Sequence, residues 1–99
     1  MRRVHELVGR RLVRFTFKAA RELAMIGAGL DAEDACDILL GLRVTDFAGR
    51  VRSESTGEWM YVFKPTVAGA VVYLKLMLRE SCLVVSFHED EGDSHEEGP

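Results

Sequence analysis

Two neighbouring segments decide the fold: VVYLKLMLR at residues 71–79 and CLVVSFH at residues 82–88. Side chains of a β-strand alternate between two faces, so each segment divides into an apolar face and a mixed face. The expected apolar faces consist of Val72, Leu74, Leu76 and Leu78 in the first segment and of Leu83, Val85 and Phe87 in the second. The pattern predicts a β-hairpin that turns at Glu80-Ser81.

The mixed face of this hairpin carries the reactive side chains. If both apolar faces cover one core, a tight two-residue turn sets Tyr73 opposite His88 and Lys75 opposite Ser86. A phenol, an imidazole and an ammonium group on the open face of a sheet can transfer protons and bind a phosphate. We therefore expect a catalytic surface here that needs neither a metal ion nor a cofactor.

Helices are expected ahead of the sheet. Apolar residues at helical spacing are Val4, Leu7 and Val8, then Ala20, Leu23, Ala24 and Ile26, then Ala35, Ile38, Leu39 and Leu42. The second helix would end at Gly27 or Gly29, and Asp31 is a suitable N-cap for the third, which exits at Gly41. Residues 12–17 fit either a short strand or an extended link.

From Phe47 onward the apolar period is two. Strands are predicted around residues 48–52 and 58–63, and Lys64-Pro65-Thr66 ends the second one because proline cannot donate to a ladder. With the hairpin they make a four-stranded, mainly antiparallel sheet. The fold class is α+β, with two to three N-terminal helices packed on one face of this sheet and the other face open.

Two further sets of residues are expected to be apolar core. Trp59, Tyr61 and Phe63 alternate onto one strand face, with a base-stacking platform as the alternative. Cys36 and Cys82 lack metal-ligand spacing and are expected to act as small buried hydrophobic residues rather than as a disulfide or a metal site.

Charge is unevenly distributed along the chain. The sequence has 13 Lys and Arg against 16 Asp and Glu, a net charge of −3, yet six of the acids lie from Glu89 onward. We expect one folded domain over residues 1–88 and a disordered acidic tail over residues 89–99. The acids of this tail, with His88 and His95, are expected to be solvated and to bind no metal. Because no apolar run reaches membrane-spanning length and no signal core is present, a cytoplasmic protein without membrane contact is expected.

The first 21 residues are basic, with Glu6 as their one acid. Such a patch attracts polyanions, so direct binding of duplex DNA by a helix around Arg10, Arg11 and Arg14 is one hypothesis. An ordinary solvated helix face is the other.

Several short motifs follow one another along the chain: Gly41-Leu42, Asp46-Phe47, Trp59, Lys64-Pro65, Gly69, Val72-Tyr73-Leu74-Lys75 and Val84-Val85-Ser86-Phe87. In order and spacing they resemble the MqsR family of bacterial toxins. The likeness covers about residues 36–88, and the VYLK and VSF blocks are its specific part.

The resemblance implies a RelE-like fold and an mRNA interferase, the toxin of a type II toxin-antitoxin system. Such a toxin cuts single-stranded mRNA as a metal-independent endoribonuclease, by attack of the 2′-hydroxyl, and leaves 2′,3′-cyclic phosphate and 5′-hydroxyl ends. The resemblance also implies an antitoxin partner with a zinc-binding part and a DNA-binding helix-turn-helix part.

Site residues carry over position by position. The family's active-site tyrosine falls on Tyr73 and its catalytic lysine on His88, which still carries protons near neutral pH. A family glutamine becomes Met60, and a basic residue falls on Gly49 with Arg50 beside it. The resemblance and the strand pattern together predict catalytic roles for Tyr73, His88 and Arg50 and substrate contacts for Lys75, Arg52, Met60 and Ser86.

Two arginines are predicted to extend the site along the substrate. Arg50 and Arg52, two residues apart on a strand, are expected to face the same way and to hold the RNA backbone on both sides of the cut. Because Met60 and Gly49 replace functional residues of the family, the alternative to an active nuclease is a catalytically weak or inactive relative that binds RNA or an antitoxin.

Overall fold

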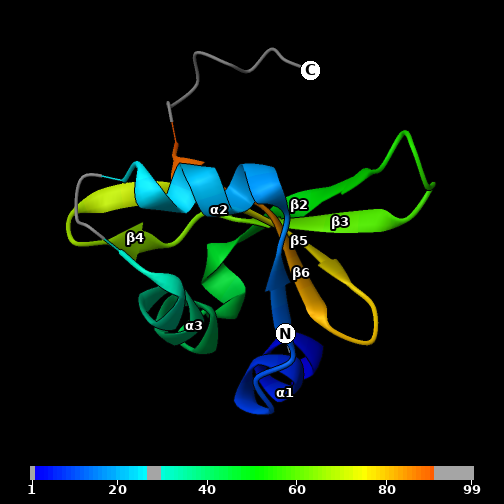
Figure 1. The fold of residues 1–99 in the computed structure, drawn as a ribbon, viewed down its shortest axis with the longest axis horizontal. Helices are drawn as coiled ribbons and strands as arrows, with labels where there is room; N and C mark the ends of the chain where they lie inside the picture. Colours follow the sequence, from blue (N-terminus) through cyan, green and yellow to red (C-terminus); the bar gives the residue numbers. More distant parts are fainter. Residues whose placement is uncertain (1, 27–29, 91–99) are drawn as a thin grey trace.

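A computed structural model describes residues 2–26 and 30–90. Its elements in chain order are α1 (Arg2–Gly9), β1 (Val13–Phe15), α2 (Phe17–Ala24), α3 (Ala32–Leu40), the 3-10 helix η1 (Val44–Asp46), β2 (Phe47–Arg52), β3 (Trp59–Phe63), β4 (Thr66–Val67), β5 (Ala70–Leu78) and β6 (Cys82–Glu89). Three helices pack on a mixed, mostly antiparallel sheet, which confirms the α+β class (Figure 1). Within these residues, no helix is long and apolar enough to cross a membrane.

In the described part of the chain, the sheet has six strands rather than the expected four. Its order is β1-β6-β5-β3-β2, and β4 pairs with β5 off this path. The four expected strands form the antiparallel series β2, β3, β5 and β6, while β1, predicted as either strand or link, lies parallel to β6. β4 is a two-residue strand paired back onto β5, a pairing too short for the apolar pattern to reveal.

Two predictions about chain segments extend beyond the described residues. The expected helix end at Gly27 or Gly29 lies outside them, although α2 itself has already ended at Ala24. The acidic tail was expected from Glu89, but β6 includes Glu89, and the main-chain N–H of Asp90 donates to the carbonyl of Val71 over 2.8 Å. Residues 91–99 lie outside the described part.

The pairing of β5 with β6 confirms the predicted partners at one end of the hairpin and corrects the other end. Tyr73 pairs with His88 and Lys75 with Ser86, as expected. Between Lys75 and Leu76 the register then shifts by one residue. An extra residue in one strand reverses the faces of all residues beyond it.

The shift changes which residues of β6 enter the core. Cys82 and Val84 are fully buried beside Phe87, whereas Leu83 and Val85 are only partly buried. The prediction of Leu83 and Val85 as core residues was therefore wrong, because it assumed an unbroken alternation. The buried position of Cys82 agrees with its expected role as a small hydrophobic residue, and Cys36 is partly buried against the same core.

We call the sheet face that packs into the core the inner face and the opposite one the outer face. The core combines one buried stripe from each helix with this inner face: Val4, Leu7, Val8, Ala19, Leu23, Ala35, Leu39, Phe63, Val72, Leu74, Leu76, Val84 and Phe87. The start of α3 agrees with the sequence signal, because the carboxylate of Asp31 accepts from the N–H of Asp34 as an N-cap. The core fixes the inner face and leaves Tyr73 and Lys75 on the outer face.

Helix α2 closes the edge of β6 where β1 ends. The Thr16 hydroxyl caps the helix by accepting from the N–H of Ala19, and α2 then runs beside β6 (Figure 1). The Glu22 carboxylate accepts a hydrogen bond of 2.8 Å from the main-chain N–H of Phe87. A side chain thus satisfies an edge donor that a further strand would otherwise have to satisfy.

Ionisation of Glu22 is coupled to this contact. Burial alone would raise its pKa, but the hydrogen bond from Phe87 and the Lys18 ammonium, 2.9 Å from the carboxylate, outweigh burial and lower the pKa below its ordinary value. A lowered pKa in the folded state means that the ionised group stabilises the fold above the unfolded pKa. This stabilisation is lost as the pH falls through the folded pKa.

We predict that Glu22→Ala lowers the free energy of unfolding at pH 7 by about 1.5–3 kcal/mol, because the substitution removes a charge-assisted hydrogen bond to a buried edge donor. The difference from the parent protein should shrink below about pH 4.3, where the carboxylate is protonated in the unfolded chain. Urea unfolding between pH 7 and pH 3 measures both effects. Glu80→Ala, at an exposed turn, is the control, and an equal loss of stability at both ends of the pH range would contradict the assignment.

Candidate active site

The outer face brings together four of the predicted site residues. Tyr73 and Lys75 on β5 lie beside His88 and Ser86 on β6. The rings of Tyr73 and His88 are stacked, with centroids 5.1 Å apart and planes inclined by 11°. Both rings are partly buried, so they are held in place and still reachable from solvent.

The hydrogen bond of His88 determines which ring nitrogen is free. Its Nδ1 lies 2.9 Å from the carbonyl oxygen of Glu89. A carbonyl oxygen can only accept, so this contact is a hydrogen bond when Nδ1 carries the proton. In the neutral ring Nε2 is then unprotonated and available to accept a proton.

The hydroxyl of Tyr73 is a donor rather than a base. Burial, and secondarily the negative charge of Asp90, raise the pKa of Tyr73 above its ordinary value of 10.0. The phenol therefore keeps its proton at neutral pH and can donate a hydrogen bond to an anion beside it.

Two lysines converge on Ser86. Lys75 faces Ser86 across the strand pair, and Lys18 reaches from α2 to place its Nζ 3.0 Å from the Ser86 hydroxyl oxygen. Burial first, and the charge of Lys18 second, lower the pKa of Lys75 below its ordinary value of 10.5. This part of the outer face concentrates positive charge and holds one ammonium group that gives up its proton more readily than a solvated lysine.

A third lysine lies on the other side of Tyr73. Phe63 pairs with Leu74, so the next residue of the chain, Lys64, comes beside Tyr73. Its Nζ lies 5.9 Å from the centre of the Tyr73 ring and 3.6 Å from a carboxylate oxygen of Asp90.

Sequence reasoning missed Lys18 and Lys64 as site residues. Lys64 had a signal, because it continues the alternation of Met60 and Val62 onto the outer face. Lys18 had none, because its position depends on how α2 docks along β6, far away in sequence.

The structure does not bring the two predicted arginines to this site. Arg50 pairs with Tyr61, and Tyr61 pairs with Leu76, a residue of the inner face. Arg50 and Arg52 do face the same way, with their guanidinium carbons 3.9 and 4.2 Å from the centre of the Trp59 ring. They lie on the inner face, so the expectation that they flank Tyr73 and His88 was wrong.

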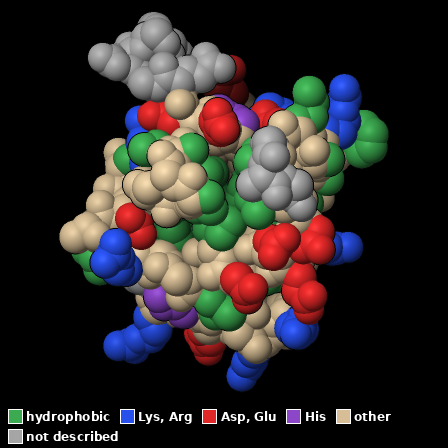
Figure 2. Space-filling model, turned by 90° about the vertical axis from the view of Figure 1, so that its left-hand side faces the viewer, with side chains coloured by type: hydrophobic (Ala, Val, Ile, Leu, Met, Phe, Trp, Pro, Cys, Tyr) green, Lys and Arg blue, Asp and Glu red, His purple; other side chains and the backbone are tan. Residues whose placement is uncertain are grey.

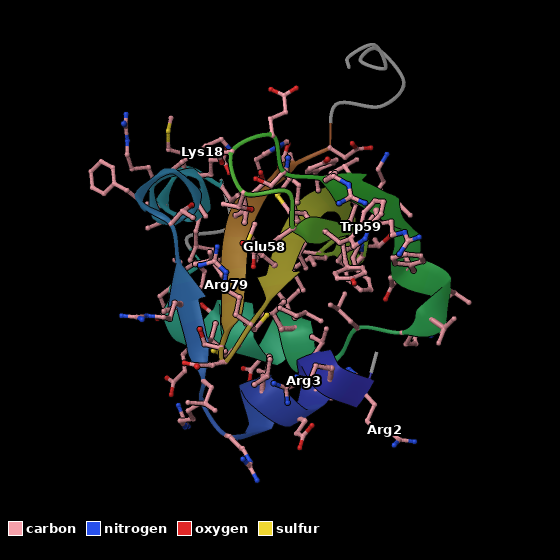
Figure 3. All side chains as sticks on the ribbon, turned by 90° about the vertical axis from the view of Figure 1, so that its right-hand side faces the viewer. Arg2, Arg3, Lys18, Glu58, Trp59 and Arg79 are labelled. Carbon is pink, nitrogen blue, oxygen red and sulfur yellow. The ribbon has the colours of Figure 1, made fainter. Side chains whose placement is uncertain are left out.

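The aromatic residues of β3 divide between two environments. Phe63 is buried in the core and Tyr61 packs against it, as predicted. Trp59 is only partly buried and is covered by the two guanidinium groups instead. Figure 3 shows Trp59 well separated from Lys18, and between them the carboxylate of Glu58 binds Arg79 at 2.6 and 3.0 Å.

Met60 lies on the outer face but offers little polar chemistry. Its relative exposure is 9%, and its neighbour across the strand pair in β2 is Val51. A thioether is only a weak hydrogen-bond acceptor, so Met60 can shape the surface next to Lys75 but cannot replace an amide there.

A hollow opens next to the stacked rings. It has a volume of about 450 Å³ and is lined by Glu22, Met25, Ile26, His88 and Glu89. His88 thus borders a space that is also lined by the apolar side chains of Met25 and Ile26, which follow α2 in the chain. A ribose or a base has room there beside the imidazole.

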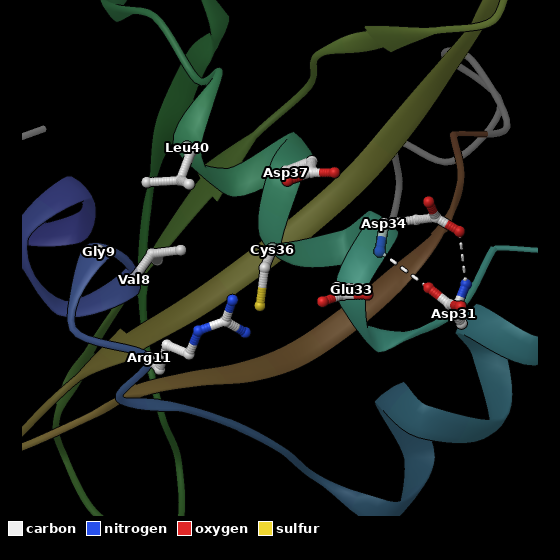
Figure 4. Close-up of a pocket in the computed structure, with 9 residues that line it drawn as sticks. All are labelled: Val8, Gly9, Arg11, Asp31, Glu33, Asp34, Cys36, Asp37 and Leu40. Carbon is white, nitrogen blue, oxygen red and sulfur yellow. Dashed lines mark hydrogen bonds between the residues drawn. The ribbon is translucent and has the colours of Figure 1, made fainter.

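A second hollow, of about 300 Å³, is predominantly acidic. Arg11 and Cys36 line it together with the acids Asp31, Glu33, Asp34 and Asp37 (Figure 4). Figure 2 shows acidic side chains gathered on the side of the molecule that carries α3. Such a surface repels phosphate, and no group of three His, Cys, Asp or Glu side chains suited to a metal ion occurs in the described part of the chain.

The position of Arg11 also bears on the DNA-binding hypothesis. Helix α1 ends at Gly9, and Arg14 belongs to β1, so the three arginines do not share one helix. Arg11 lies among the acids of α3. The expected basic helix around these residues is therefore not formed.

Comparison with known proteins identifies relatives of this chain. A protein family described as "Motility quorum-sensing regulator, toxin of MqsA" matches residues 1–89. The mRNA interferase toxin MqsR of Escherichia coli (strain K12) is 34% identical over 62 residues, which are 62% of this chain. The match spans 63% of that relative, less than two thirds of its length.

We predict opposite tautomers for two histidines. Neutral His88 should carry its proton on Nδ1, whereas His5, whose Nε2 lies 3.0 Å from the carbonyl oxygen of Leu42, should carry it on Nε2. Long-range ¹H–¹⁵N correlation spectra at a pH where both rings are neutral distinguish the two forms. The Nε2–H form at His88 would show that Nε2 is not free to act as a base.

Proposed function

The chain belongs to the MqsR toxin family, and from this we propose that it is an mRNA interferase, an endoribonuclease that cuts single-stranded mRNA in the cytoplasm and is neutralised by an antitoxin of the MqsA type. The observation that carries the proposal is the stack of Tyr73 on His88, with Nε2 free and lysines on either side. It provides a base, a neutral donor and cations within one face of the sheet.

The first step of the reaction is assigned to His88. Its free Nε2 takes the proton of the ribose 2′-hydroxyl, and the 2′ oxygen attacks the adjacent phosphorus. The bond from phosphorus to the 5′ oxygen of the next nucleotide then breaks. The products are a 2′,3′-cyclic phosphate and a 5′-hydroxyl end.

The proton for the leaving oxygen is assigned to Lys75. In-line displacement requires the acid and the base on opposite sides of the phosphate. Lys75 is diagonal to His88 across the strand pair, a relation that corresponds to about 7–8 Å. The lowered pKa of Lys75 makes its ammonium group a better proton donor at neutral pH than a solvated lysine.

The negative charge on the phosphate is stabilised by side chains next to His88 and Lys75. The protonated Tyr73 hydroxyl donates to a non-bridging oxygen, and Lys18 adds positive charge next to Ser86. All the required functions come from side chains, so the proposed reaction needs no metal ion. Arg50 and Arg52 take no part in the cut, because they lie on the inner face.

One observation favours the alternative of a weak or inactive relative. Met60 is nearly buried and lacks the hydrogen-bonding amide of the family's glutamine. In that case the outer face would still bind RNA or the antitoxin through its lysines. RNA binding without cleavage would identify this function.

We predict that purified protein cleaves single-stranded RNA in EDTA and that His88→Ala lowers kcat about 10²- to 10⁴-fold. Tyr73→Phe removes one donor to the phosphate and should lower kcat about 10²-fold. The matched controls are Tyr61→Phe and His5→Gln, which lie away from the outer face. Gel analysis with identification of the cyclic-phosphate ends provides the readout, and unchanged cleavage by both site variants would overturn the proposal.

The assignment of the acid predicts a pH profile. kcat/KM should fall on the alkaline side, at a pH below 10.5, as Lys75 loses its proton. Lys75→Arg should reduce the rate and remove the alkaline fall, because a guanidinium keeps its proton. Lys64→Arg is the matched control and should keep the alkaline limb. If Lys75→Arg keeps it too, another group is the acid.

A further inference from the structure

We propose that Lys64 binds an RNA phosphate adjacent to the one that is cut and that the carboxylate of Asp90 occupies this phosphate site in the free protein. The inference rests on the proposed function. It adds a substrate-binding residue and an internal competitor for the same position.

The place of Lys64 relative to the reacting groups supports a neighbouring phosphate. Lys64, Tyr73 and His88 follow one another across neighbouring strand positions on the outer face. Strands are about 4.8 Å apart, so Lys64 lies roughly two spacings from His88. A phosphate beside His88 therefore leaves room for the next one at Lys64, with the Tyr73 ring between them.

Asp90 is held in position by the main chain. Glu89 pairs with Val72, and the N–H of Asp90 continues the contact by donating to the carbonyl of Val71. Its side chain is only 16% exposed and lies 3.6 Å from Nζ of Lys64. One carboxylate oxygen thus lies beside the lysine, where an oxygen of a phosphate could lie instead.

Asp90 also acts on the candidate active site. After burial, its negative charge is the second cause of the raised pKa of Tyr73. An anion at this position therefore raises the pKa of the Tyr73 phenol, which would donate to the cut phosphate.

The ion pair between Lys64 and Asp90 is weak enough for a phosphate to replace the carboxylate. Lys64 is 40% exposed at its side chain, and ion pairs of this kind are weak. A phosphate delivered by a bound RNA strand can replace the carboxylate, after which Asp90 turns to solvent. Removal of the charge of Asp90 should therefore increase the affinity for RNA without any change in the reacting groups.

The test is a binding experiment that does not depend on cleavage. The probe is a single-stranded 2′-O-methyl RNA oligonucleotide, which lacks the attacking hydroxyl. Asp90→Asn should bind it about two- to fivefold more tightly, and Lys64→Gln should bind it more weakly. In the double variant Asp90→Asn should have no effect, because the lysine that it frees is absent.

Two controls separate a local site from a general charge effect. Glu89→Gln removes the adjacent, exposed carboxylate and makes the same change in net charge. It should change affinity less than Asp90→Asn does. If Lys64 makes one additional phosphate contact, the slope of log K against log salt should steepen by about 0.7 in Asp90→Asn. The phenol titration of Tyr73 should also move to lower pH in this variant and not in Glu89→Gln.

The outcomes distinguish this inference from the proposed function. Equal gains from Asp90→Asn and Glu89→Gln, a gain that persists without Lys64, or no binding by any variant would each overturn the phosphate site. If the protein cleaves RNA but these variants bind RNA like the parent, the nuclease proposal stands and the phosphate site at Lys64 is excluded. If the effects of Asp90→Asn and Lys64→Gln on RNA binding are coupled in a protein that does not cleave RNA, the phosphate site is supported and the nuclease proposal is excluded.

Discussion

The candidate site depends on a one-residue register shift in the pairing of β5 with β6. A hairpin without the shift would turn Cys82 and Val84 away from the core while it kept Phe87 inside. The shift lets both ends of β6 bury their apolar side chains, and it falls just beyond Lys75. Tyr73 and His88 therefore keep the register that makes them neighbours, and the energy of core burial holds them there.

Contacts at the edge of β6 contribute both to the stability of the fold and to the candidate active site. Glu22 satisfies the N–H of Phe87 and at the same time binds Lys18, which in turn contacts Ser86. The docking of α2 thus delivers a cation to the outer face. One helix therefore both covers the edge of the sheet and supplies positive charge to the proposed phosphate site.

The sequence allowed the central part of this arrangement to be predicted, because alternation is a local property. It placed Tyr73 beside His88 and Lys75 beside Ser86 correctly. It failed for Leu83 and Val85, since the chain itself does not mark where an extra residue enters a strand. It failed for Arg50 because its face depends on the pairing of β3 with β5 as well as on its own strand.

Two of the three lysines on the outer face already have carboxylate partners, Lys18 with Glu22 and Lys64 with Asp90. The salt bridges of the described residues include none for Lys75, and its pKa is lowered by burial and by Lys18. Proton affinity is thereby reduced at the one lysine assigned as an acid, while the flanking charges are held in place by acids. The negative charge of a bound phosphate would raise the pKa of Lys75, so Lys75 would keep its proton in the bound state. As the leaving oxygen develops negative charge it becomes the stronger base, so proton transfer is coupled to bond breaking.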